Sequence, residues 1–128
     1  MACIRALSDG GGSGSGGYEY KTDVSKKSNY AASLSLTSGK KYIVIIVTCW
    51  VNKNYPGMWS TISSITGATD LQTVISPTTH YGYGSNTPYE FSAYSFTATS
   101  NTVTISRGNN YGSGDLSDNT VDYLIFEQ

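Results

Sequence analysis

The sequence predicts an all-β protein, specifically a two-sheet antiparallel sandwich of the jelly-roll type with about seven or eight strands. Three observations predict it. Short apolar or alternating segments follow one another along the chain, turn-forming residues separate them, and no window has the 3.6-residue apolar period of an amphipathic helix. The 128 residues suit one domain, large enough to bury a core without disulfides or a structural metal.

The first strands have the clearest patterns. Residues 32–36 alternate apolar with small polar side chains, as in a strand with one buried face. Residues 41–51, KYIVIIVTCWV, form a continuous β-branched and aromatic run, which predicts a central strand that is buried on both faces or paired on both edges. The run ends at NKNYPG, where Pro56 presets φ for a turn and Gly57 admits positive φ.

The middle of the chain predicts two shorter strands and a loop. Residues 61–66 and 71–76 each contain two β-branched apolar residues. Pro77 is expected to end the second strand because proline cannot donate a ladder hydrogen bond. Residues 78–88, TTHYGYGSNTP, are expected to form an irregular aromatic loop.

The last third predicts three more strands. In residues 89–97 the apolar phase shifts after Ala93, which predicts a β-bulge. Residues 102–106 and 120–128 follow, separated by a long Gly/Asn/Asp loop. The apolar runs at 42–51 and 124–126 are expected to be neighbouring core strands.

The N-terminal residues differ in composition from the rest. MACIRALSD precedes the flexible coil GGGSGSGG, which would span roughly 15 Å on average. We therefore divide the chain into an anchor peptide with its linker, residues 1–17, and a sandwich domain, residues 18–128. A disordered tail and an expression artefact are the alternatives. The anchor contacts are expected from Cys3, Ile4, Arg5 and Leu7.

Charge and cysteine content narrow the function classes. Charged residues make up 13% of the chain, about half the ~25% usual in globular domains, and the net charge of −1 gives no overall electrostatic case for nucleic acid or a membrane surface. Cys3 and Cys49 lack a disulfide-framework spacing, so two free thiols and synthesis in a reducing cytoplasm are expected, with a bridge as the alternative. No secretion signal and no apolar run of transmembrane length are found in the sequence.

Catalytic chemistry has few candidates. His80 is the one histidine, and no phosphate-binding loop occurs. Asp115, Asp118 and Asp122 could offer oxygens to calcium, but turn formation accounts for the first two more simply. The sequence therefore predicts no enzyme, no cofactor and no metal site.

The eleven tyrosines are the most informative residue type. Tyrosine and tryptophan give rigid, amphipathic contact area in protein interfaces, and sugar rings pack on the same side chains. Several lie in predicted loops. The sequence favours the interpretation that they line the sandwich rim or a subunit interface, and contact with a partner or with a glycan is the alternative. The candidate contact residues are Tyr55, Trp59, His80, Tyr81, Tyr83 and Tyr111.

A short N-terminal peptide, a glycine-rich arm, the early buried run KYIVIIVTCW and the closing strand VDYLIFEQ together resemble the small sandwich domains of tailed-bacteriophage virion proteins. These include head fibres, capsid decorations and tail appendages. The resemblance implies a non-enzymatic homo-oligomer, often a trimer, made in the host cytoplasm and bound to a capsid or tail protein of the virion.

Two classes of function therefore remain from the sequence. One is a virion structural protein anchored through residues 1–9. The other is a carbohydrate- or receptor-binding module that uses the Tyr/Trp-rich loops. Both can coexist on one particle, whereas an enzyme is disfavoured by the scarcity of catalytic residues.

Overall fold

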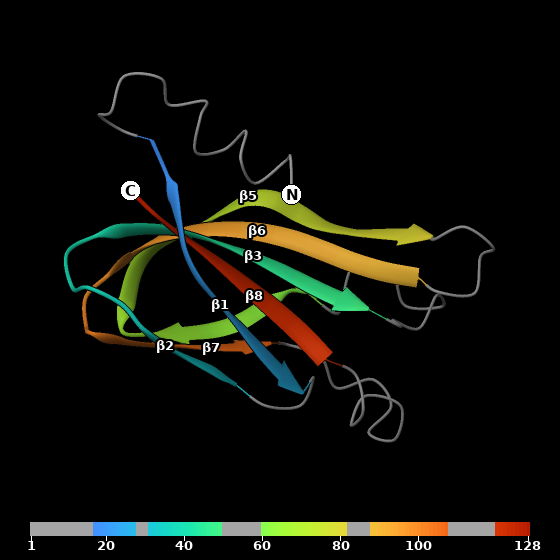
Figure 1. The fold of residues 1–128 in the computed structure, drawn as a ribbon, viewed down its shortest axis with the longest axis horizontal. Coiled ribbons are helices and arrows are strands. Elements are labelled where there is room, and N and C mark those ends of the chain that lie inside the picture. Colours follow the sequence, from blue (N-terminus) through green and yellow to red (C-terminus); the bar gives the residue numbers. More distant parts are fainter. Residues whose placement is uncertain (1–16, 28–30, 50–59, 82–87, 108–119) are drawn as a thin grey trace.

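The computed structural model describes residues 17–27, 31–49, 60–81, 88–107 and 120–128 (Figure 1). Every helix or strand assigned in these residues is a strand, and no helix able to span a membrane is found in them. The strands are β1 (Glu19–Lys27), β2 (Ala32–Ser35), β3 (Lys41–Cys49), β4 (Ile62–Thr66), β5 (Ala68–Tyr81), β6 (Pro88–Ala98), β7 (Thr102–Arg107) and β8 (Thr120–Glu127).

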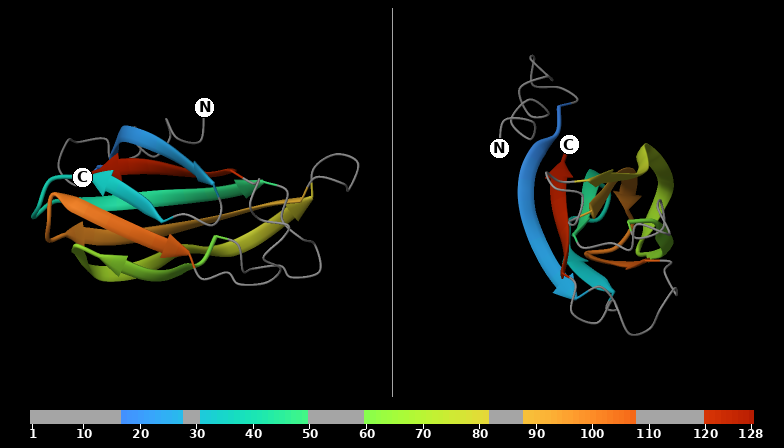
Figure 2. Two further views of the ribbon diagram at one scale, coloured as in Figure 1. Left: turned by 90° about the horizontal axis from the view of Figure 1, so that it is seen from below. Right: turned by 90° about the vertical axis from the view of Figure 1, so that its right-hand side faces the viewer.

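The eight strands form two antiparallel sheets that pack face to face (Figure 2). The larger sheet has the order β1-β8-β3-β6-β5 and the smaller one β2-β7-β4. The pairs β1·β8, β2·β7 and β3·β6 nest within one another along the chain, as in a long hairpin rolled into a jelly roll. The predicted all-β, two-sheet sandwich is therefore confirmed.

The core lies between the two sheets, and β3 runs through the middle of the larger one. Its residues Tyr42, Val44 and Ile46 are fully buried against the smaller sheet. Its two neighbours are β6 and β8, which confirms the prediction that the runs at 42–51 and 124–126 are adjacent. The side chains on the outward face of β3 are also apolar. Ile43 and Ile45 alternate with the core residues along the strand and are only half-buried.

The two ends of the sandwich differ in their connections. At one end, called here the turn end, short links join β2 to β3, β4 to β5 and β6 to β7. Backbone hydrogen bonds connect these links, because Leu36 N–H donates to the Asn101 carbonyl and Thr99 N–H donates to the Gly67 carbonyl. At the opposite end, called the loop end, the chain passes from β1 to β2, β3 to β4, β5 to β6 and β7 to β8 (Figure 1). Glu19 pairs with Glu127, so β1 starts and β8 finishes at the turn end.

The prediction that Pro77 ends a strand is wrong. β5 continues to Tyr81, so residues 78–81 are strand rather than loop. Proline is tolerated here because β5 is the edge strand of its sheet and its pairing with β6 is irregular between Ile75 and Thr78.

The predicted bulge in residues 89–97 is also wrong. β6 pairs with β3 without interruption from Lys41–Thr97 to Cys49–Tyr89. The apolar phase shift arises because both faces of β6 are apolar, with Tyr94 and Phe96 in the core and Ala93 buried on the outward side. The irregularities lie in β5, at three places along its pairing with β6.

A carboxylate joins three strands at the turn end. Glu127 of β8 accepts hydrogen bonds from Lys21 Nζ at 2.7 Å, Lys40 Nζ at 3.0 Å and the Tyr42 hydroxyl at 2.7 Å. The Tyr42 hydroxyl also accepts a bond from the Thr37 backbone N–H at 2.8 Å. The bonds from Lys21, Tyr42 and Lys40 lower the pKa of Glu127 from 4.5 to about 2.

This depressed pKa makes a prediction about acid stability. Because the pKa is lower in the folded state, Glu127 stabilises the fold above pH 4.5 and loses that contribution as the pH falls toward about 2. Glu127→Gln should lower the free energy of unfolding by about 1 kcal/mol at pH 6, since the side chain is partly exposed. Urea unfolding at several pH values should show this difference shrinking toward zero near pH 2, and a constant difference would contradict it.

Candidate functional site

The predicted contact residues belong to segments whose flanking strands end or begin at the loop end. Tyr55, Trp59, Tyr83 and Tyr111 lie outside the described residues. The strand ends that flank their segments lie next to one another in the larger sheet. In its register Cys49 is paired with Tyr89, Tyr81 with Pro88, and Thr48 with Val121. The antiparallel topology therefore attaches all three aromatic segments to one end of the sandwich (Figure 1).

His80 lies in β5 and not in a loop, which corrects the prediction for this residue. Its ring stacks on Phe91 at 5.0 Å and on Tyr89 at 5.3 Å between centroids. Its Nε2 atom is buried and has no hydrogen-bond partner among the described residues. Tyr81 is the last residue of the same strand. His80 is thus part of an aromatic stack on the outward face of the larger sheet, beside Tyr89, which is 37% exposed.

A buried polar cluster lies beneath the loop end, between the sheets. Glu90 of β6 is fully buried, and its Oε1 accepts hydrogen bonds from the Ser60 backbone N–H at 2.7 Å and the Ser60 hydroxyl at 3.0 Å. Its Oε2 accepts a bond from the Thr79 hydroxyl at 3.0 Å. Ser92 donates to the Ser60 carbonyl at 2.6 Å. These bonds hold the chain that enters β4 against β5 and β6.

Arg107 of β7 and Tyr123 of β8 extend this cluster across the sandwich. Burial lowers the pKa of Arg107 and raises the pKa of Tyr123, while the interaction between the two side chains opposes both shifts. The negative charge of Glu90 also favours the protonated form of Arg107. The cluster therefore links the end of the smaller sheet to β6 and β8 of the larger one.

The hydrogen bonds of this cluster connect separate strands to one another. Both oxygens of the Glu90 carboxyl already accept hydrogen bonds from the protein. Among the described residues, no group of three or more His, Cys, Asp or Glu side chains gathers as metal ligands would. Asp122, one of the calcium alternatives, accepts a hydrogen bond from Ser25, and Asp115 and Asp118 lie outside the described residues. The arrangement stabilises the described strand ends at the loop end.

The expected anchor contacts fall outside the structural description, which begins at residue 17. These residues are Cys3, Ile4, Arg5 and Leu7. The division of the chain into an anchor and a sandwich stays a prediction. What the structure adds is the point of attachment, because Tyr18 lies at the turn end, next to the start of β1.

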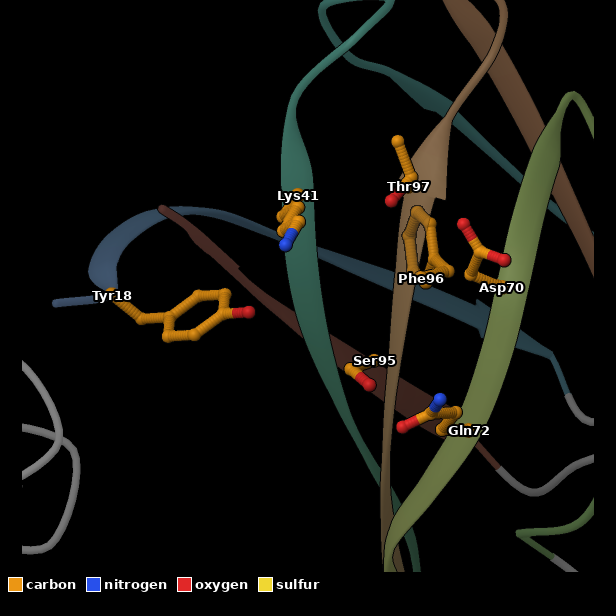
Figure 3. A pocket seen from close by; sticks show the side chains of 7 residues that line it. All are labelled: Tyr18, Lys41, Asp70, Gln72, Ser95, Phe96 and Thr97. Atoms are coloured by element: carbon orange, nitrogen blue, oxygen red, sulfur yellow. The ribbon is translucent and has the colours of Figure 1, made fainter. Parts of the chain in front are cut away.

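The sequence did not predict a pocket on the outward face of the larger sheet near the turn end (Figure 3). It encloses about 350 Å³. Four elements contribute to it: the residue just before β1, the start of β3, the start of β5 and the last part of β6. We call this cavity the outer pocket. Its lining residues are Tyr18, Lys41, Asp70, Gln72, Ser95, Phe96 and Thr97.

Sheet register explains how the outer pocket forms. Lys41 is opposite Thr97, and Gln72 is opposite Ser95, so these four side chains share the outward face. The alternating pattern of β6 could have placed Ser95 and Thr97 together, but no sequence signal brings β5 beside them. Phe96, whose ring is stacked on Tyr42 in the core, also borders the pocket.

The fold and its two unlike ends define a jelly-roll β-sandwich in which β1 starts and β8 finishes at the turn end, and the strands joined by the longer connections end at the other. No family model, no curated protein and no solved structure matches the chain. Its function is therefore inferred from the geometry of the loop end, the turn end and the outward sheet face.

Proposed function

We propose that this protein is a non-enzymatic structural protein of a tailed-bacteriophage virion, such as a head fibre, capsid decoration or tail appendage. It is held by its N-terminal segment and presents the loop end away from the particle. One observation carries the proposal: the chain enters the sandwich at the turn end, opposite the loop end. The nine residues of β3 separate these ends by about 30 Å, from ~3.3 Å per residue.

This geometry suits an anchored, displayed domain. A peptide bound to a capsid or tail protein through residues 1–9 would hold the turn end toward the particle, and the glycine-rich linker would leave the sandwich free to orient. The Tyr/Trp-rich segments are then attached at the far end. A low charged fraction, 13%, also suits close packing in an assembly.

The outward face of the larger sheet supports a homo-oligomer. On this face Ile75 of β5, 41% exposed, lies opposite Ala93 of β6, which lies opposite the half-buried Ile45 of β3. Contiguous exposed apolar residues often mark contacts between proteins. Contact with a second or third copy would cover them, in keeping with the trimers of the virion proteins that the sequence resembles.

The test compares particle incorporation of two forms of the protein. Phage particles are purified on a density gradient from lysates that express either the full chain or a chain that lacks residues 1–9. Mass spectrometry should detect the full chain in the particles, whereas the shortened chain should stay soluble and folded. A deletion of residues 10–13 is the control, since it shortens the linker and keeps the anchor. Absence of the full chain from particles, or equal incorporation of all three, would contradict the proposal.

A second candidate function is binding of a host-surface glycan or receptor at the loop end. Attachment of three aromatic segments to one end supports it, because aromatic side chains from several segments could then form one surface. Changing Tyr81 and Tyr83 together to alanine should abolish retention on host-surface glycans without loss of incorporation into particles. Tyr20→Ala is the control, since Tyr20 is 47% exposed but lies near the turn end. Unchanged retention in the double variant would rule this function out.

A further inference from the structure

The outer pocket is lined by six polar side chains that have no hydrogen-bond or ion-pair partner among the described residues. This contrasts with Glu127 nearby, whose carboxylate is bonded to three side chains. Tyr18 projects toward β3 with its hydroxyl leading, and Asp70 and Gln72 point from β5 toward β6 (Figure 3). Several donors and acceptors thus face one hollow and are available to a ligand. The six are Tyr18, Lys41, Asp70, Gln72, Ser95 and Thr97.

Asp70 is placed in this pocket by an unusual backbone. It is the one non-glycine residue of the described chain with a positive φ, at 57°. It lies in an irregularity of β5, between the Thr69–Thr97 and Gln72–Ser95 pairs. Left-handed backbone is uncommon at non-glycine residues, although aspartate adopts it more readily than most, and β-bulges redirect side chains. The bulge therefore accounts for the position of the Asp70 side chain at the outer pocket.

Charge and size indicate the class of ligand. Lys41 and Asp70 carry opposite charges, so the lining is balanced overall and does not select an anion or a cation. The remaining groups are an amide, two aliphatic hydroxyls and a phenol, which suit a neutral ligand with many hydroxyls. About 350 Å³ is at the lower end of the ~300–1,000 Å³ of small-molecule sites, so one ring fits better than a long chain.

We propose that the outer pocket binds a neutral saccharide unit. The Asp70 carboxylate and the Gln72 amide bond to neighbouring hydroxyls of the sugar. Lys41, Ser95 and Thr97 donate to its oxygens from the floor, and the Tyr18 ring packs against a C–H face of the sugar. This site is distinct from the loop end and does not depend on the proposed virion function.

The test is an NMR titration of the full-length protein with glucose, galactose and N-acetylglucosamine, each up to about 50 mM, since single sugars bind weakly. At least one sugar should shift the backbone amides of Lys41, Ser95 and Thr97 in a saturable way. Asp70→Gly should weaken binding at least tenfold and keep the fold, because glycine adopts positive φ without strain. Asp70→Asn should bind the sugar more tightly than Asp70→Gly does, since asparagine keeps one acceptor oxygen.

Two variants separate this site from the others. The double Tyr81→Ala and Tyr83→Ala variant should keep sugar binding at the outer pocket unchanged, even if it loses retention at the loop end. Failure of the particle-incorporation test leaves this titration unaffected. The proposal is overturned if no sugar shifts the pocket amides, if Asp70→Gly binds as tightly as the native protein, or if free amino acids, which carry both charges, bind there more tightly than the sugars.

Discussion

Replacing Glu90 with alanine is expected to lower the free energy of unfolding by about 3–5 kcal/mol, because it removes one member of a buried, charged network. The carboxyl group is fully buried and accepts bonds from the Ser60 backbone, the Ser60 hydroxyl and Thr79. Alanine would leave these buried donors without their acceptor and would remove the negative charge that favours protonated Arg107. The strand ends beneath the loop end should loosen first.

Equilibrium urea unfolding, followed by intrinsic tryptophan fluorescence and circular dichroism, measures this effect. Thr79→Val is the matched control, since it deletes a single hydrogen bond to the same carboxyl group and should cost only about 1 kcal/mol. Glu90→Gln should fall between the two, because the amide keeps one acceptor oxygen. If Glu90→Ala proved no more destabilising than Thr79→Val, the cluster would not support the loop end as described.

Gly67→Ala is expected to cost about 3 kcal/mol. Gly67 connects β4 to β5 with a φ of +75°, which costs an alanine about 1–2 kcal/mol. A Cβ atom at this position would also overlap the backbone carbonyl oxygen of Thr102, and such overpacking adds about 1–3 kcal/mol. The turn-end bond from Thr99 N to Gly67 O would be strained in addition.

Gly39 is a close internal control for that substitution. It has a φ of +90° in the turn before β3, but an added Cβ would meet no atom within 4 Å. Gly39→Ala should therefore cost only the backbone term, about 1–2 kcal/mol. Thermal and urea unfolding of both variants separate the two contributions, and equal losses of stability would show that the contact with Thr102 does not matter.

Much of the fold followed from local patterns in the sequence. Strand residues alternate between the two faces of a sheet. The alternation at residues 32–36 therefore predicts that Leu34 is buried, and the apolar run from residue 41 predicts that Val44 is buried, as both are. The nested pairing of distant strands, such as β1 with β8, could not be predicted in detail because it depends on how the two sheets close around the core. Pro77 misled the prediction because its effect depends on whether the strand is at an edge.

The site was less predictable than the fold. Aromatic composition drew attention to three segments, but it could not show that the antiparallel connectivity attaches all three to the same end of the sandwich. Nothing local distinguished Glu90 from an exposed strand residue, since its burial comes from Ser60 and Thr79 of other segments. The outer pocket includes Asp70, whose positive φ could not be predicted from a single aspartate in a Thr-Asp-Leu sequence.

The central claim is that the turn end faces the particle and the loop end faces outward. The most direct measurement is antibody access to an epitope tag on intact, purified phage particles, with the tag inserted after Asn110 or, in a second form, after Ser38 in the turn before β3. We predict that antibody binds particles that carry the tag after residue 110 at least tenfold better than those tagged after residue 38, while both denatured proteins bind equally. Equal access to the two tags, or better access to the tag at the turn end, would contradict the proposed orientation.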